Sequence, residues 1–186
     1  MKTYEQIKEY IQNILSEKRF YHSECVANRC IELAKIYEVD EEKAKLVGIA
    51  HDVAKEMPAE EQIKYAKENG IKLDEIELKN TKLLHAIIGA KICEKEFGFT
   101  KDMVEAVRNH TTGTPYMDML SKVLFISDAT GIDRTYDEAK HLYEIATKDI
   151  DQAIFECLSS TIKEIVERGL PLHIDTVRTR NEYLLK

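Results

Sequence analysis

Residues 41–55 read EEKAKLVGIAHDVAK, and the fold can be predicted outward from this stretch. Its apolar residues recur at the three- and four-residue intervals that are typical of an amphipathic helix. At its end an imidazole stands beside a carboxylate, His51-Asp52, among small and apolar neighbours. Because burying either polar group without a partner would cost about 1–3 kcal/mol, we expect other polar side chains to converge on this pair.

The same periodicity continues along almost the whole chain, which predicts an all-α protein. The 186 residues include only 7 Gly and 3 Pro and are rich in strong helix formers. We expect helices over residues 3–17, 22–38, 40–54, 58–69, 81–97, 100–110, 117–130, 138–146, 149–168 and 176–185. Residues 70–80 and 111–117 are expected to be irregular connections.

Residues that typically begin or end helices lie at the ends of these predicted helices. Asp40 is expected to be an N-cap, and Pro58 suits a first helical position. Gly70, Gly98 and Gly169 are placed to follow helix ends.

Length and composition indicate one globular domain over residues 1–186. Hydrophobic residues make up 44% of the chain and charged residues 33%. No segment reaches the roughly 20 apolar residues of a membrane span, and the N-terminus lacks the apolar region of a signal peptide. We therefore expect a cytoplasmic protein without a membrane partner.

Cysteine usage and net charge narrow the chemistry further. The four cysteines form no CxxC pair, and their apolar helical neighbours predict reduced core thiols: Cys25, Cys30, Cys93 and Cys157. The formal net charge of -7 argues against a nucleic-acid partner, because phosphate backbones are usually bound by a basic face. A small anionic substrate remains compatible if a metal and a few local cations offset this charge.

Four histidines and two aspartates are candidate ligands of a metal ion: His22, His51, Asp52, His85, His110 and Asp128. Asp128 lies in the apolar run 123–129, where a carboxylate without a counter-charge would be costly. A nitrogen and oxygen ligand set suits iron, manganese, cobalt or zinc, and the absence of cysteine disfavours structural zinc. For each histidine alone, the alternative is a satisfied buried side chain or a helix-end cation. We interpret His141 as an ordinary surface residue.

These residues resemble a known signature. His22, the doublet His51-Asp52 and Asp128 are similar to the H…HD…D pattern of HD-domain metal-dependent phosphohydrolases, with His85 and His110 at the positions of additional histidines. More narrowly, several segments resemble the YqeK group, known as symmetrical diadenosine tetraphosphate hydrolases that release two ADP: residues 19–23, 51–55, 84–86, 110–113, 127–129 and 172–176, the last followed by Arg180-Asn181.

Two other HD groups fit the sequence less well. A (p)ppGpp hydrolase would resemble HDxxED, whereas Lys55-Glu56 occupies the last two positions here. A cyclic-di-GMP phosphodiesterase would resemble HHExxDGxGYP, but His110 is followed by TTGTP.

The resemblance implies an HD-type helical bundle that holds one or two divalent transition metal ions, with iron preferred over manganese, cobalt or zinc. It assigns the first ion to four ligands: His22, His51, Asp52 and Asp128. His85 and His110 would bind a second ion or contact phosphate. The C-terminal helices would close over the nucleotide through one segment: Leu170, Pro171, Leu172, His173, Ile174 and Asp175. The alternative for this segment is a helix-to-helix connection that ends in a capping Asp or Thr.

The expected reaction is attack of metal-bound hydroxide on an inner phosphorus of diadenosine tetraphosphate, with His51, Asp52 and Lys55 as catalytic residues. Lys55 follows His51 by four residues and so shares its helix face, although an exposed lysine is the alternative. We expect the Arg134 guanidinium to clamp a phosphate; its alternative is a surface salt bridge. The remaining expected contacts to the dinucleotide or to ADP come from Ser23, His85, His110, Thr111 and Asp128.

Other functions stay open at this point. The same apparatus would serve an HD-domain nucleotidase or nucleoside triphosphohydrolase. A nucleotide-binding regulator with little turnover and a purely structural helical module are the non-enzymatic alternatives. Exposed apolar helix faces would also allow a homodimer.

Overall fold

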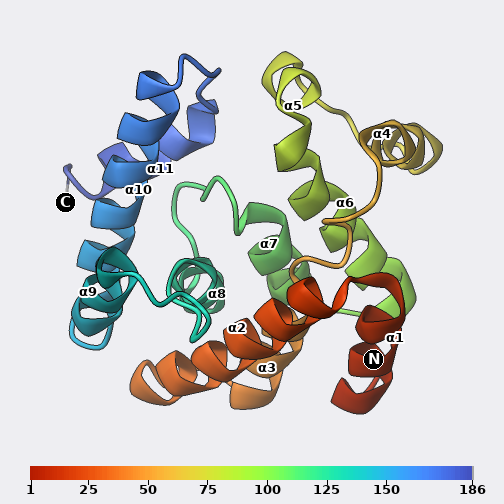
Figure 1. Cartoon of the computed structure of the whole chain (residues 1–186), viewed down its shortest axis with the longest axis horizontal. Coiled ribbons are helices and arrows are strands. Elements are labelled where there is room, and N and C mark those ends of the chain that lie inside the picture. Colours follow the sequence, from red (N-terminus) through yellow and green to blue (C-terminus); the bar gives the residue numbers. More distant parts are fainter. Residues whose placement is uncertain (186) are drawn as a thin grey trace.

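The computed structural model describes residues 1–185, and each regular element in that range is helical (Figure 1). The all-α prediction is therefore confirmed. The α-helices are α1 (Tyr4–Ile14), α2 (Glu17–Ile36), α3 (Glu41–Ala50), α4 (Ala59–Glu68), α5 (Glu75–Lys79), α6 (Leu84–Ile92), α7 (Lys101–Asn109), α8 (Met119–Ala129), α9 (Asp137–Ala146), α10 (Ile150–Glu167) and α11 (Ile174–Glu182). A 3-10 turn over Thr81–Leu83 precedes α6, and a π-helical turn over Cys93–Phe97 follows it.

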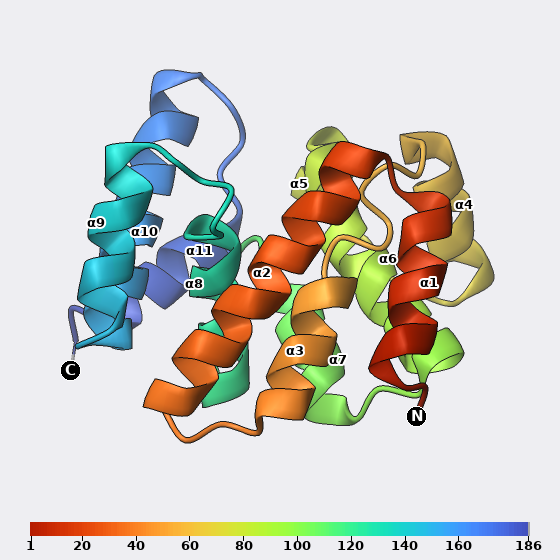
Figure 2. The same ribbon diagram turned by 60° about the horizontal axis from the view of Figure 1, so that its bottom comes forward.

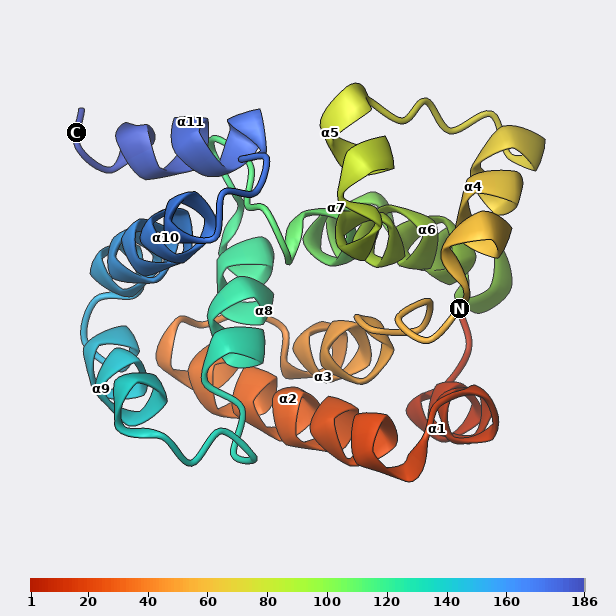
Figure 3. The same cartoon turned by 45° about the horizontal axis from the view of Figure 1, so that its top comes forward.

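Helix α3 occupies the centre of the bundle. It packs against α1, α2, α7 and α8, so its apolar face is covered from several directions. Helices α9, α10 and α11 gather on one side of α8, while α4, α5 and α6 lie on the opposite side of the molecule (Figures 1 and 3). This division leaves α2, α3, α7 and α8 between the two groups.

Helices α2 and α3 approach each other closely at Gly48. A Cβ atom at this position would lie 2.6 Å from the Cα of Ala27, closer than real Cβ contacts allow. The two helices run side by side (Figure 2). This contact holds the His22 turn of α2 next to the end of α3, where the His51-Asp52 pair follows.

Several predicted helix ends are confirmed. The Asp40 side chain accepts hydrogen bonds from the backbone N–H groups of Glu42 and Lys43, which makes it the N-cap of α3. Gly70, Gly98 and Gly169 all have positive φ, the conformation that glycine adopts most easily after a helix. Pro58 stands one residue earlier than expected, as the N-cap of α4.

Two sequence predictions about the elements are wrong. Residues 70–80 are not wholly irregular, because Asp74 and Glu77 form a reciprocal capping box that starts the short helix α5. Helix α2 begins at Glu17 instead of residue 22, because the Ser16 hydroxyl caps the N–H of Arg19.

The cysteines are free thiols, as predicted: Cys25, Cys30 and Cys93 are buried and Cys157 is half-buried. Over residues 1–185, no helix combines the length and apolar character that a bilayer crossing requires.

Candidate metal centre

The six candidate ligands come together from five helices and their ends. His22 lies in α2, His51 caps the end of α3 with Asp52 next to it, His85 lies in α6, His110 ends α7, and Asp128 lies in α8. The four histidines and Asp52 are buried, whereas the side chain of Asp128 is 25% exposed. The site is thus an interior cluster in which Asp128 is the most exposed of the six side chains.

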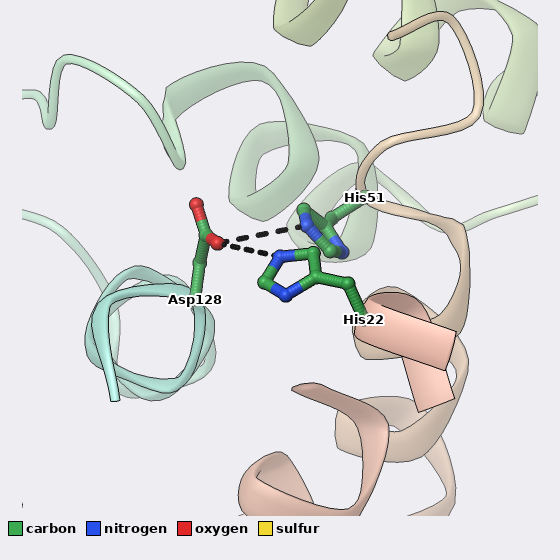
Figure 4. A group of neighbouring side chains, drawn as sticks. All are labelled: His22, His51 and Asp128. Carbon is green, nitrogen blue, oxygen red and sulfur yellow. Dashed lines mark hydrogen bonds and ion pairs between the residues drawn. The ribbon is translucent and has the colours of Figure 1, made fainter. Parts of the chain in front are cut away.

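One end of the cluster is formed by His22, His51 and Asp128 (Figure 4). The Oδ1 atom of Asp128 lies 3.0 Å from Nε2 of His22 and 3.8 Å from Nε2 of His51. Their ligand atoms all lie within 4.8 Å of one another. This spacing allows one ion to contact all three side chains.

The other end is formed by His85 and His110, with Asp52 between the two ends. Asp52 Oδ1 lies 3.2 Å from Nε2 of His85 and 3.7 Å from Nε2 of His110. Asp52 Oδ2 lies 3.6 Å from Nε2 of His51. Asp52 is therefore placed to contact ions at both ends.

Backbone carbonyl groups fix the orientation of three of the rings. The Nδ1–H groups of His51, His85 and His110 donate to the carbonyl oxygens of the residues three positions earlier, at 2.8, 2.6 and 2.7 Å. In a neutral ring the Nε2 atom then carries a lone pair, the form that binds a metal ion.

These lone pairs face one another. The Nε2 atoms of His85 and His110 are 3.1 Å apart, and His51 Nε2 and Asp52 Oδ1 are buried without a hydrogen-bond partner. Acceptor atoms at this spacing repel one another unless a cation lies between them. The residues present therefore fit a divalent transition metal ion.

The electrostatics favour ligands that are ready to bind. Burial lowers the pKa of His51 to about 4 and also lowers the pKa of His85, so both rings are neutral near pH 7. Burial alone would raise the pKa of Asp52 and Asp128, but the neighbouring histidines hold the pKa of both carboxyls well below its usual range. Burial likewise opposes the charge on His22, yet hydrogen bonds to Asp128 and Asp133 raise its pKa.

Two residues of the site were not predicted from the sequence. The Asp133 carboxylate accepts a 2.8 Å hydrogen bond from Nδ1 of His22, the arrangement that orients many metal-binding histidines. The Arg19 guanidinium lies 3.3 Å from Asp52 Oδ2. The available signals were the position of Arg19 one helical turn before His22 and of Asp133 directly before Arg134.

A cationic cleft adjoins the His85 end. Its volume is about 390 Å³, and Arg19, Lys55 and Lys82 line it together with His85. The Lys55 ammonium lies 3.0 Å from His85 Nε2 and 3.5 Å from Asp52 Oδ1. Helix α3 ends at Ala50, however, so Lys55 reaches the centre from the turns that follow the helix and not, as predicted, from the helix face of His51. A cleft of this charge next to a metal centre can hold a polyphosphate.

Arg134 lies at the opposite end. It donates from Nη2 to Asp128 Oδ1 at 3.1 Å and from Nε to the Asp128 carbonyl at 3.0 Å. Its guanidinium thus contacts the centre, and this contact is itself a salt bridge between two partly exposed side chains, as the alternative has it. The phosphate clamp stays a prediction.

The other expected substrate contacts are spread more widely. Thr111 Oγ1 lies 3.4 Å from His85 Nε2, whereas Ser23 is fully buried and its hydroxyl has no hydrogen-bond partner. His173 and Asp175 line a small cavity together with Thr111. The other residues of the segment 170–175 are exposed or half-buried: Leu170, Pro171, Leu172 and Ile174.

The two remaining histidines, His173 and His141, lie outside the ligand cluster. The N-cap of α11 is His173, whose Nδ1 accepts from the N–H of Asp175, so the alternative for this segment, a connection that ends in a capping Asp or Thr, does not hold in that form. His141 is exposed, as predicted.

Comparison with known proteins agrees with this geometry. The model of the HD domain family matches residues 19–153. The chain belongs to the HD domain family. This membership implies that the His and Asp cluster binds a divalent metal ion.

Similar proteins are found over nearly the whole length of this HD-domain chain. A protein of Halalkalibacterium halodurans named symmetrical bis(5'-nucleosyl)-tetraphosphatase is 34% identical, over 92% of each chain. The protein of that name from Bacillus subtilis is 32% identical, again over 92% of each chain. The crystal structure of an HD superfamily hydrolase from Clostridium acetobutylicum, described as involved in NAD metabolism, is 34% identical with a TM-score of 0.96, covering 100% of this chain and 98% of that one.

Proposed function

We propose that this protein is a metal-dependent hydrolase that cleaves diadenosine tetraphosphate symmetrically into two ADP. The observation that carries this proposal is the interior cluster of six imidazole and carboxylate ligands beside a cationic cleft. Relatives named for this activity match the chain over 92% of its length. We further propose iron as the bound metal, with manganese, cobalt or zinc as alternatives.

The proposed ligands of the first ion are His22, His51, Asp52 and Asp128, with His85 and His110 left to a second ion or to phosphate. A divalent cation held there supplies Lewis-acid chemistry: it lowers the pKa of a coordinated water molecule and neutralises charge on the phosphoryl oxygens. The side chains of the protein orient the substrate around it.

Positive side chains would hold the polyphosphate in line. Lys55 and Arg19 reach the Asp52 carboxylate from the cleft, so they can bind phosphoryl oxygens next to the reacting phosphorus. Their charges oppose the build-up of negative charge in the transition state. The water oxygen bonds to one inner phosphorus, the central P–O bond breaks, and the products are two ADP and a proton.

The segment 170–175 and helix α11 are proposed to close over one nucleotide. Support comes from the position of His173 and Asp175 beside Thr111, the residue after His110; the cavity that these three residues line is itself only about 40 Å³. The single domain with C-terminal helices over its site is part of the same proposal.

Product analysis tests the function. The protein, purified without oxygen and supplied with ferrous iron or manganese, should convert diadenosine tetraphosphate to ADP alone. AMP plus ATP would contradict symmetric cleavage, and faster release of phosphate from a nucleoside monophosphate would favour a nucleotidase. Tight ADP binding without turnover on any divalent metal would favour a regulator.

The first prediction concerns Asp52. Asp52→Asn should lower kcat by at least about a thousandfold, because the carboxylate contacts both ends of the ligand cluster. His141→Gln, at an exposed position, should retain activity within about twofold. Equal activity in the two variants would remove Asp52 from the reaction.

A further inference from the structure

A second large cavity lies on the other side of the metal centre. Its volume is about 740 Å³, and it is lined by residues from the end of α8, the loop before α9, and helices α9 and α10. We call it the α9–α10 cavity and define it by six of its lining residues: Arg134, Tyr136, His141, Glu156, Ser160 and Thr161. Of these six, the metal centre described above uses only Arg134.

This cavity adjoins the metal centre next to Asp128. Its wall includes Ala129, the next residue in the chain, and Arg134, whose guanidinium donates to Asp128 Oδ1 at 3.1 Å. Burial, and then the charge of Asp128, raise the pKa of the Cys157 thiol in the same wall. The inner end of the cavity therefore borders the His22 and Asp128 end of the cluster.

The cationic cleft and Thr111 border the opposite end, at His85. Between the two ends, contacts run from Asp128 to His51 at 3.8 Å, from His51 to Asp52 at 3.6 Å, and from Asp52 to His85 at 3.2 Å. The metal centre thus lies between the cationic cleft and the α9–α10 cavity.

We propose that the α9–α10 cavity binds the second nucleoside of the substrate. The inference rests on the proposed function, since a dinucleoside tetraphosphate carries identical nucleosides at equal distances from its central bond. With that bond at the metal centre, each nucleoside needs a place of its own at the end of two phosphates. One lies toward Thr111 and the segment 170–175, and the other enters the α9–α10 cavity.

The charges that line the cavity fit a nucleoside better than a phosphate. Its wall includes three glutamates, Glu138, Glu156 and Glu164, and the guanidinium of Arg134 is at the inner end beside Asp128. The carboxylates repel phosphate but accept hydrogen bonds from ribose hydroxyls and from the amino group of adenine. Arg134 is placed to meet the phosphate that enters the centre.

The volume of the α9–α10 cavity and its remaining side chains also fit a nucleoside. A volume of about 740 Å³ lies within the usual range of small-molecule sites. The Tyr136 ring is half exposed at the wall, and an exposed aromatic ring offers a stacking surface to a base. Ser160 and Thr161 add hydroxyl groups for hydrogen bonding.

Two variants and two substrates test this site. Tyr136→Ala removes the stacking ring, and Ser160→Trp fills the cavity from an exposed position on α10. Both should raise the KM for diadenosine tetraphosphate roughly tenfold. Adenosine 5'-tetraphosphate has the same phosphates but only one nucleoside, and its kcat/KM should change by less than about twofold. Val166→Trp, on an exposed position of α10, is the matched control.

The outcomes separate the subsite from the activity. Equal losses on both substrates, or no change in KM for diadenosine tetraphosphate, would overturn the second nucleoside site. A wild-type protein that makes no ADP from either tetraphosphate would instead contradict the proposed function.

Calorimetry supplies a readout that does not depend on turnover. The metal-loaded wild-type protein should bind two ADP molecules per chain, Ser160→Trp only one, and Val166→Trp two. A single ADP per wild-type chain, or two in Ser160→Trp, would overturn the inference.

Discussion

At the scale of single residues, Asp133 tests how the ligands are oriented. Asp133→Asn should weaken metal binding roughly 10- to 100-fold, because an amide no longer supplies the charged acceptor that holds the His22 ring. Titration of the metal-free protein with the metal measures this affinity. Asp137→Asn, at a fully exposed carboxylate nearby, is the control, and equal affinities in the two variants would exclude this role for Asp133.

His51 gives a pH dependence of stability in the metal-free protein. Its folded pKa is about 4, below the ordinary 6.5, so between these values the unfolded chain binds a proton that the folded chain does not. The neutral His51 ring therefore contributes to the free energy of unfolding. This contribution is fully present above pH 6.5 and is lost as the pH falls toward 4. At about 1.4 kcal/mol per pKa unit, the loss is about 3 kcal/mol.

Denaturant unfolding from pH 7 to pH 4 in a chelator measures this loss. His51→Gln, which cannot take up the proton, should show a correspondingly shallower slope over the same range. Identical slopes in the two proteins would contradict the low pKa of His51.

The six candidate ligands could be predicted because each is a chemically distinctive residue in an apolar segment and together they match a family signature. Asp133 and Arg19 could not, since their roles depend on contacts to His22 and Asp52 across the fold. Ser23 shows that sequence proximity can mislead. Its place beside His22 in the sequence predicted a substrate contact, but in the structure its side chain is fully buried.

At the scale of helices, the close contact of α2 with α3 sets the spacing of the ligands. Gly48→Ala should reduce the free energy of unfolding by about 1–3 kcal/mol, because the added Cβ would lie 2.6 Å from the Ala27 backbone. Gly89→Ala, where the nearest atom is a Val53 side-chain methyl at 3.2 Å, should cost less. Chemical denaturation compares them, and an equal or larger loss for Gly89→Ala would contradict this account.

The periodic apolar pattern predicted the long helices because each has one face to bury. Helix α5 was not predicted because its five residues are too few to show a helical repeat of apolar residues. It depends instead on the capping box of Asp74 and Glu77. The start of α2 was missed because its first turn, Glu17–Phe20, is largely exposed and so lacks the apolar pattern.

At the scale of the whole molecule, the metal should stabilise the fold. The ligands come from α2, α3, α6, α7 and α8, or the residues next to them, so a bound ion links most of the bundle. At a free concentration of a hundred times its Kd, an ion adds about 2.7 kcal/mol to the free energy of unfolding. Thermal unfolding with and without a chelator should show this as a lower Tm in the chelator, and an unchanged Tm would contradict it.

The most direct test is the metal content of protein purified without oxygen. Elemental analysis should find one or two divalent transition metal ions per chain in the wild type and in His141→Gln. In the double variant His51→Gln/Asp128→Asn, most of the metal should be lost while the helical circular dichroism remains. A wild-type protein that binds no such metal at saturating concentrations, or a folded double variant with undiminished metal content, would contradict the assignment of these side chains as the metal centre.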